Sequence, residues 1–268
     1  MGYRAAVIQM CSGTDVDANP ASAERLIGDA AGEGARLVAL PENFALMPAR
    51  SSALLDCARQ RADEIDAFLS SRAARHGIVL VGGSFPVPSG DEARVYGSCR
   101  LYDESGRSLA AYEKMHLFDV EVSDTESYRE SDYTAHGERV VSAATSLGTI
   151  GLSICYDMRF PELYRQLAGE GAQVLSMPSA FTVPTGEAHW NVLLRARAIE
   201  NLCYVIAPAR AGTHENGRRT FGHSMIVGPF GEVLGCLPRG EGICCADIDL
   251  DRLHRVRERL PALSHRRL

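Results

Sequence analysis

The chain has 268 residues, of which 46% are hydrophobic and 23% charged, so it can bury a large core and is not disordered in its main state. Its formal net charge of -6 offers no positive field to a phosphate backbone, and we expect no nucleic-acid partner. No uncharged stretch reaches the roughly 18 residues that span a bilayer, and the first residues lack the apolar run of a secretory signal. These features predict a cytoplasmic protein with no membrane partner.

Apolar runs rich in β-branched residues alternate with segments of helical pattern. In chain order, strands are predicted at residues 5–9, 37–40, 78–81, 95–102, 108–112, 150–154, 174–177, 203–207, 224–227, 232–236 and 243–248. Helices are predicted at residues 21–31, 53–75, 161–169, 188–200 and 250–259. Glycine-containing turns at 103–106 and 229–232 predict two hairpins. This mixture indicates an α/β fold with mixed sheets, and so many strands favour two packed sheets.

Residues 119–138 are acidic, poor in aromatic residues and without a clear period, which predicts a long loop. Loops of this length in a compact domain are usually functional or disordered. We therefore keep the carboxylates of this segment, Glu130 among them, as candidates for a site.

Cysteine and lysine usage is informative. The eight cysteines lack the spacing of a zinc site or a redox motif, so we expect no metal and mostly buried thiols in a reducing compartment. The 28 basic residues comprise 27 arginines and a single lysine, Lys114. A general preference for arginine explains solvated cations but not a position that needs a compact ammonium. Lys114 is therefore either functional or a leftover surface lysine.

Three reactive side chains, Glu42, Lys114 and Cys155, each follow a predicted strand. Cys155 lies in a bend between a strand and a helix, where α/β proteins place ligands, and the helix N-terminus would stabilise its thiolate. Thiol, carboxylate and ammonium together can perform acyl transfer at a carbonyl. Because strand ends commonly carry polar residues, their coincidence here is suggestive only.

The segments that contain them are PENF (41–44), YEKMHLFD (112–119) and GLSICYDMRFPELYR (151–165). In order and spacing these resemble the Glu, Lys and Cys signatures of the nitrilase superfamily, the carbon-nitrogen hydrolases. The similarity continues through residues 128–137, 178–201, 221–234 and 257–268. The resemblance implies one carbon-nitrogen hydrolase domain over residues 1–268, an α/β four-layer α-β-β-α sandwich with two mixed β-sheets, and a homodimer.

Within the superfamily the chain resembles the Nit branch, which includes deaminated glutathione amidases and ω-amidases. Its segments YRESDYT (128–134) and LPALSHRR (260–267) are more similar to the former. One departure is Tyr96-Gly97-Ser98, because many relatives have Asn in this strand. This departure puts the adjoining part of the substrate pocket in doubt, but not the three signature residues.

The resemblance also implies roles for these residues. Glu42 takes the proton of Cys155, which attacks the amide carbonyl; Glu42 then protonates the departing ammonia and activates water against the thioester. Lys114 and the backbone N–H of Tyr156 hold the oxyanion, a task that a compact ammonium suits better than a guanidinium. Glu130, which without the resemblance is a solvated loop carboxylate, matches the second glutamate of relatives. Only side chains and water take part, so we expect no cofactor.

A carboxylate-bearing substrate requires a cation and hydrogen-bond donors in its pocket. We predict Arg159, Phe181 and Thr185 for this role, with an ion pair from Arg159 to Asp157 or Glu162 as an equal alternative. We expect His189 and Trp190 either to pack in the core or to bind substrate. Arg195 and Arg197 are expected to support the fold or the dimer.

The leading hypothesis is thus a Cys-dependent amidase that cleaves a small carboxylate-bearing amide through a thioester and releases ammonia, with deaminated glutathione as the first substrate. Hydrolysis of 2-oxoglutaramate is the nearest alternative. A non-catalytic binding or adaptor protein of the same fold, and acyl transfer to an amine, are the alternatives of other classes. The intact set of Glu42, Lys114 and Cys155 argues against an adaptor.

Overall fold

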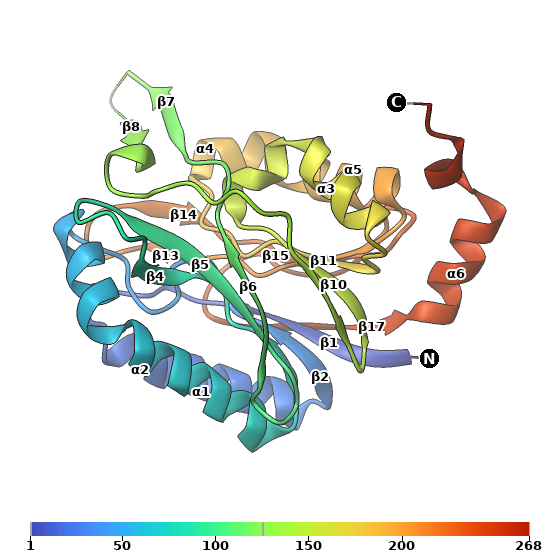
Figure 1. The fold of residues 1–268 in the computed structure, drawn as a ribbon, viewed down its shortest axis with the longest axis horizontal. Helices are drawn as coiled ribbons and strands as arrows, with labels where there is room; N and C mark the ends of the chain where they lie inside the picture. The colour runs from blue at the N-terminus through green and yellow to red at the C-terminus, as the bar shows by residue number, and fades with distance from the viewer. Residues whose placement is uncertain (1, 125, 268) are drawn as a thin grey trace.

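Two β-sheets packed face to face form the centre of the computed structural model, which describes residues 2–124 and 126–267 (Figure 1). The first sheet has seven strands, ordered β17-β1-β2-β3-β5-β4 with β6 paired to β5. Their bounds are β1 Gly2–Gln9, β2 Ala35–Ala39, β3 Val79–Val81, β4 Phe85–Pro88, β5 Val95–Tyr102, β6 Ser108–Glu113 and β17 Gly242–Asp249. Because β1, β2 and β3 are parallel while β17 and β5 run antiparallel to their neighbours, the sheet is mixed.

The second sheet has six strands in the order β16-β15-β12-β11-β10-β9. Their bounds are β9 Ser142–Thr145, β10 Gly148–Leu152, β11 Val174–Ser176, β12 Tyr204–Ala207, β15 Ser224–Val227 and β16 Val233–Leu237. The three central strands are parallel and the outer pairings antiparallel. Both sheets are therefore mixed, as the sequence predicts.

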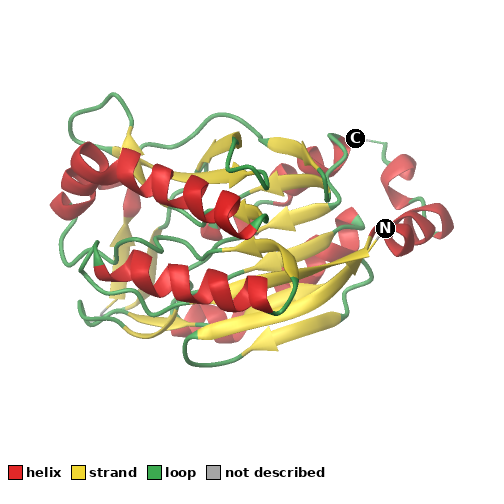
Figure 2. Ribbon diagram, turned by 90° about the horizontal axis from the view of Figure 1, so that it is seen from below, coloured by secondary structure: helices red, strands yellow, loops and turns green. Residues whose placement is uncertain are grey.

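Helices cover the outer face of each sheet, which makes four layers (Figures 1 and 2). The first sheet is covered by α1 (Ala18–Gly32) and α2 (Ser52–His76), and the second by α3 (Pro161–Gly169) and α5 (Asn191–Asn201). The C-terminal α6 (Leu250–Arg259) and the short helix η4 (Ala262–His265) lie beside the layers in Figure 1. The predicted α-β-β-α sandwich is confirmed.

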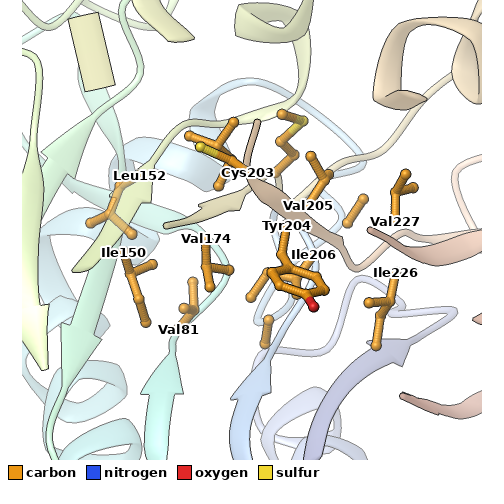
Figure 3. Close-up of a cluster of buried hydrophobic side chains, with 14 of the residues drawn as sticks. Val81, Ile150, Leu152, Val174, Cys203, Tyr204, Val205, Ile206, Ile226 and Val227 are labelled. Atoms are coloured by element: carbon orange, nitrogen blue, oxygen red, sulfur yellow. The ribbon is translucent and has the colours of Figure 1, made fainter. Parts of the chain in front are cut away.

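Strand alternation explains the layers, because successive side chains point to opposite faces of a sheet. In β1, Ala5 and Val7 belong to the core between the sheets, whereas Ala6 and Ile8 pack with α1 and α2. Figure 3 shows the same alternation in the second sheet, where Ile206 and Ile226 point toward the facing sheet. Their neighbours Val205 and Val227 point to the other side. Both faces of each sheet are thus buried, as near-continuous apolar strands require.

All eleven predicted strands, five helices and both hairpins are present within a few residues of their expected positions. The prediction of an unbroken loop over 119–138 is wrong. That segment contains a hairpin of β7 (Asp119–Ser123) and β8 (Glu126–Arg129), followed by the short helix η1 (Glu130–Asp132). The strands are short and half exposed, so their acidic outer positions hid the alternation of Val120 and Val122.

Four other short elements also went unpredicted: β4, β9, and the paired strands β13 (Ala211–Thr213) and β14 (Arg219–Phe221). The helix predicted at 188–200 is preceded by two short helical turns, α4 (Val183–Thr185) and a π-helix at Gly186–Trp190. Among the described residues, no helix combines the length and apolar content needed to cross a bilayer.

Candidate active site

Glu42 follows β2, on a segment that is fixed from both sides. The backbone N–H of Asn43 donates to Ser84 Oγ at 2.9 Å, and Asn43 adopts a left-handed φ of 52°. The buried Arg210 donates from Nη1 to the Asn43 carbonyl at 2.7 Å. Strained backbone of this kind persists where surrounding structure holds it, and here it orients the Glu42 carboxylate inward.

Lys114 follows β6 directly, and its backbone N–H donates to the Gly97 carbonyl on β5 at 2.9 Å. The residue is only 2% exposed. Its Nζ lies 2.9 Å from Glu42 Oε1 and 2.9 Å from both carboxylate oxygens of Glu130. The single lysine of the chain is therefore a buried ammonium between two carboxylates, and the interpretation as a leftover surface residue is excluded.

Glu130 reaches this place from η1, beyond the β7–β8 hairpin that stands at the top of Figure 1. Its Oε2 also accepts a hydrogen bond of 2.6 Å from the backbone N–H of Phe118. The carboxylate thus joins the two ends of the hairpin to Lys114. Glu130, which matches the second glutamate of relatives, is therefore in direct contact with the lysine.

Cys155 begins a short 3-10 helix, η2 (Cys155–Arg159), three residues after β10 ends. Its φ is +49°, in the left-handed region that few side chains adopt, and its backbone N–H donates to the Pro178 carbonyl at 2.9 Å. A nucleophile on such a tight bend is presented at the carboxyl edge of the sheet. In this position the thiol interacts with the Glu42 carboxylate.

Asp157, fully buried, ties the Cys155 turn to the Lys114 segment. Its Oδ2 accepts from the Ile154 backbone N–H at 2.8 Å and from the Tyr112 hydroxyl at 2.7 Å. Its Oδ1 accepts from the backbone N–H of His116 at 3.0 Å and lies 2.7 Å from that residue's Nδ1. One carboxylate thus sets the position of two catalytic candidates that belong to different sheets.

The charges of the site determine its resting protonation. Burial raises the pKa of Glu42, but the Lys114 ammonium outweighs it, and this pKa lies below its ordinary value. Burial raises the pKa of Glu130 more than Lys114 lowers it. For Lys114, burial acts to lower the pKa, but the carboxylates of Glu130 and Glu42 hold it well above the usual range. The lysine is therefore charged, and Glu42 is the stronger acid of the two carboxyl groups.

Burial, followed by the neighbouring Glu42 carboxylate, raises the pKa of the Cys155 thiol above its ordinary value. The prediction that a helix N-terminus stabilises a resting Cys155 thiolate is therefore wrong. The helix in that prediction is α3, which begins at Pro161, six residues beyond Cys155, whereas burial and the facing Glu42 carboxylate act on the thiol itself. The resting site holds a neutral thiol beside a carboxylate that can accept its proton.

A pocket of about 420 Å³, including the part open to solvent, lies over these groups. It is lined by Glu42, Lys114, Phe118, Tyr128, Glu130, Tyr133, Cys155, Tyr156, Ala180, Phe181, Thr185 and Arg218. All four predicted catalytic residues and Tyr156 therefore share one cavity with Phe181 and Thr185. Among residues 2–124 and 126–267, no three His, Cys, Asp or Glu side chains gather as a metal site.

Arg159 lies behind the side chains that line the pocket and is not among them. Its guanidinium stacks over the rings of Tyr156 and Phe181, 5.5 and 5.6 Å from their centroids, and Nη1 lies 3.3 Å from His189 Nδ1. Within the described residues it forms no ion pair with Asp157 or Glu162. Its role in binding substrate remains a prediction.

The other basic and aromatic side chains selected from the sequence support the fold around the pocket. Trp190 is buried and donates from Nε1 to the His223 carbonyl at 2.8 Å. Arg197 donates from Nε to the Met158 carbonyl at 2.9 Å, inside the Cys155 turn. Arg195 donates to the Gly231 carbonyl at 2.7 Å.

Sequence reasoning missed five pocket residues: Phe118, Tyr128, Tyr133, Ala180 and Arg218. The first three lie in or near the segment predicted as a loop. Arg218 follows Asn216-Gly217, a pair that favours a hairpin turn and was the available signal for β13 and β14. Besides Lys114, Arg218 is the only cationic side chain among the described residues that line the pocket.

Comparison with known proteins agrees with this geometry. Residues 4–258 match the carbon-nitrogen hydrolase family. The chain is 45% identical over 267 residues to the deaminated glutathione amidase of Synechocystis, covering 98% of each chain. Its structure matches the C. elegans NitFhit protein with a TM-score of 0.91 and 38% identity, over 99% of this chain and 65% of that one. It matches Saccharomyces cerevisiae Nit3, a member of branch 10 of the nitrilase superfamily, with a TM-score of 0.89 and 31% identity, over 100% and 97%.

The chain belongs to the carbon-nitrogen hydrolase family of the nitrilase superfamily. It is accordingly an enzyme of the amidase type, acting on carbon–nitrogen bonds.

Proposed function

We propose that this enzyme is a deaminated glutathione amidase with Cys155 as its nucleophile. The observation that carries the catalytic assignment is the buried ammonium of Lys114, held at 2.9 Å between Glu42 and Glu130 in the cavity that Cys155 also lines. The relatives from Synechocystis and mouse that bear this name are 45% and 41% identical to the chain. Their names support the choice of substrate.

In the proposed first step, Cys155 Sγ bonds to the amide carbon while Glu42 accepts the thiol proton. The carbonyl oxygen becomes an oxyanion, and Lys114 Nζ and the backbone N–H of Tyr156 stabilise it. Glu42 then delivers its proton to the amide nitrogen, the C–N bond breaks, and a thioester remains. Water, deprotonated by Glu42, attacks this thioester, and the thiol leaves with the returned proton.

The leaving group depends on which amide is cleaved. Deaminated glutathione contains only secondary amides, so its hydrolysis releases an amine of the peptide part rather than ammonia. The expected ammonia belongs to 2-oxoglutaramate, which has a primary amide. Cleaving either compound at the corresponding amide gives the same acid product, 2-oxoglutarate, and this product is the fair basis for comparing them.

Binding of the acyl part draws on other residues of the pocket. Phe181 and Thr185 line the pocket, and Arg159 lies directly behind Phe181. We propose that these three residues hold the 2-oxo acid end of the substrate, with Arg159 supplying the charge. Cys155 and its neighbours then meet the amide at the other end of a five-carbon acyl chain.

The test is formation of 2-oxoglutarate by the purified protein from deaminated glutathione and from 2-oxoglutaramate at equal concentrations. Cys155→Ala serves as the blank, and Cys57→Ala, a buried cysteine on α2 outside the pocket, serves as the matched control. We expect preference for deaminated glutathione, lost in the blank and kept in the control. Preference for 2-oxoglutaramate would make the protein an ω-amidase, and an unreactive wild-type protein would refute the substrate class.

We also propose that two such single-domain subunits, each comprising residues 1–268, pair as a homodimer. Exposed apolar side chains gather on one region, where Ile199 of α5 packs on Gly231. The adjacent Phe230 shares a surface groove with Leu260. Phe230 is 64% exposed and Ile199 45%, which is unusual for side chains of this size when they lie together. A second subunit would cover them.

A further inference from the structure

Arg218 is a cation of the pocket that forms no ion pair within the described part of the chain. It lies between β13 and β14, where Gly217 has a φ of +82°. Its Nη2 donates to the Ala180 carbonyl at 3.0 Å, and its guanidinium lies 4.9 Å from the centroid of the Tyr128 ring. Its Nε is buried without a hydrogen-bond partner, and no carboxylate in residues 2–124 and 126–267 forms an ion pair with it. The residue lines the pocket over Cys155, so a bound substrate can supply the acceptor that the guanidinium lacks.

Arg218 and Tyr128 stand where the catalytic pocket meets a second groove. Both residues line the pocket over Cys155, and both line a neighbouring groove of about 680 Å³, including open solvent. The groove is completed by Glu126, Val183, Pro184, Gly217 and Arg219. A substrate longer than the pocket can therefore extend past Arg218 toward the surface.

The groove opens from the pocket in which the C–N bond would break. Arg218 and Tyr128 line that pocket together with Glu42 and Cys155. In the proposed function, on which this inference rests, Glu42 protonates the departing nitrogen. The substituent on that nitrogen then has the groove past Arg218 as its way out of the pocket.

The pocket around the Cys155 thiol and the neighbouring groove differ in the sign of their net charge. Around the thiol, one ammonium faces the two carboxylates of Glu42 and Glu130, which leaves an excess of negative charge. In the groove, Arg218 and Arg219 outnumber Glu126, whose Oε1 already accepts from the Tyr128 hydroxyl at 2.7 Å. An anionic group on the leaving amine is therefore repelled from the reacting centre and attracted to the groove.

We propose that Arg218, assisted by Arg219, binds the free carboxylate of the leaving amine. The site thereby selects amides whose amine part is an amino acid or short peptide with a free carboxyl end. The planar guanidinium, whose Nε has no hydrogen-bond partner among the described residues, has the geometry to bind a carboxylate. The Tyr128 ring, over which it lies, holds it in position. Primary amides have no group that can reach it, so Arg218 separates the two substrate classes.

The test compares two substrates that differ only at this end: deaminated glutathione, and the same compound with its terminal glycine carboxyl converted to an amide. For the wild-type enzyme we expect kcat/KM to be about 10- to 100-fold higher for the free acid, the usual value of a hydrogen-bonded charge. Arg218→Gln should bring the ratio of kcat/KM for the free acid to kcat/KM for the amide analogue close to 1. Arg218→Lys should recover part of the preference, because it keeps the charge without the planar guanidinium.

Arg107→Gln, an exposed arginine in the β5–β6 turn paired with Asp103, is the matched control and should retain the wild-type ratio. Equal rates of the wild-type enzyme on both substrates would overturn the role of Arg218 and leave the proposed function intact. Equal losses on both substrates in Arg218→Gln would also overturn it, since they would show a role in folding or in the acyl half. Failure of the wild-type enzyme on both compounds would overturn the proposed function and this inference together.

Discussion

A single residue, Lys114, contacts both carboxylates of the proposed active site. An arginine at this position would keep the charge, but its planar guanidinium cannot place one nitrogen 2.9 Å from Glu42 and from Glu130 in a site built for an ammonium. We predict that Lys114→Arg lowers kcat/KM at least about 100-fold, the cost of removing an oxyanion donor. Steady-state kinetics on deaminated glutathione measures this. The reverse exchange at a solvated site, Arg107→Lys, should have no effect, and wild-type rates in Lys114→Arg would refute the oxyanion role.

The pH dependence of catalysis follows from the resting protonation state. In the proposed mechanism, activity requires Glu42 ionised and Cys155 protonated. Since Lys114 holds the pKa of Glu42 below its ordinary value of 4.5, kcat/KM should fall only in acid below that value. Since burial and Glu42 raise the pKa of Cys155 above 9.0, the profile should stay flat from about pH 6 to about pH 9. A rising limb between about pH 8 and about pH 9 would show instead that a free thiolate is the resting nucleophile.

Sequence reasoning located the three residues to which we assign catalysis because each follows a strand and lies in a long signature segment. Glu42, Lys114 and Cys155 needed no knowledge of contacts for this. It failed where three-dimensional neighbours decide the chemistry. The protonated state of Cys155 depends on its burial beside a residue 113 positions away, and Arg218 enters the pocket from a hairpin too short to show a period.

Among the elements, the segment that carries Glu42 depends on a contact with the turn after β3. Gly83 has a φ of +64°, and a Cβ there would lie 2.2 Å from the Pro41 carbonyl oxygen. Gly77 is the matched control, because its φ is +60° and a Cβ would meet nothing within 4 Å. Gly77→Ala should lower the free energy of unfolding by about 1–2 kcal/mol, the cost of the left-handed conformation, and leave kcat unchanged.

Gly83→Ala should destabilise the protein more than this and also lower kcat, because the clash displaces the backbone next to Glu42. Denaturant unfolding and steady-state kinetics on both variants separate the two effects. Equal stability and equal kcat in the two variants would show that Pro41 yields without moving the carboxylate.

Sequence reasoning recovered the elements whose buried apolar side chains recur regularly along the chain. Helix α3 was placed at its observed bounds because Pro161 suits a first turn and its apolar face repeats. Strand β4 was missed because Pro86 and Pro88 remove backbone donors, which only an edge strand tolerates. The hairpin of β7 and β8 was missed because it packs on one side only.

At the scale of the whole molecule, the exposed apolar region predicts a change of assembly state. We expect the wild-type protein to sediment as a dimer, and the double variant Ile199→Asp with Phe230→Asp to sediment as a folded monomer, because two buried charges would oppose association. Ala93→Asp, in the exposed turn before β5, is the control and should remain dimeric. A wild-type monomer, or a double variant that still pairs, would refute this interface.

The reactive groups are divided between the two halves of the sandwich. Glu42 and Lys114 extend from the first sheet, and Cys155 extends from the second. In the proposed mechanism the nucleophile therefore meets its base only where the two sheets pack together. Because the sheets share one buried core, the same packing that stabilises the fold also assembles the hydrolytic centre.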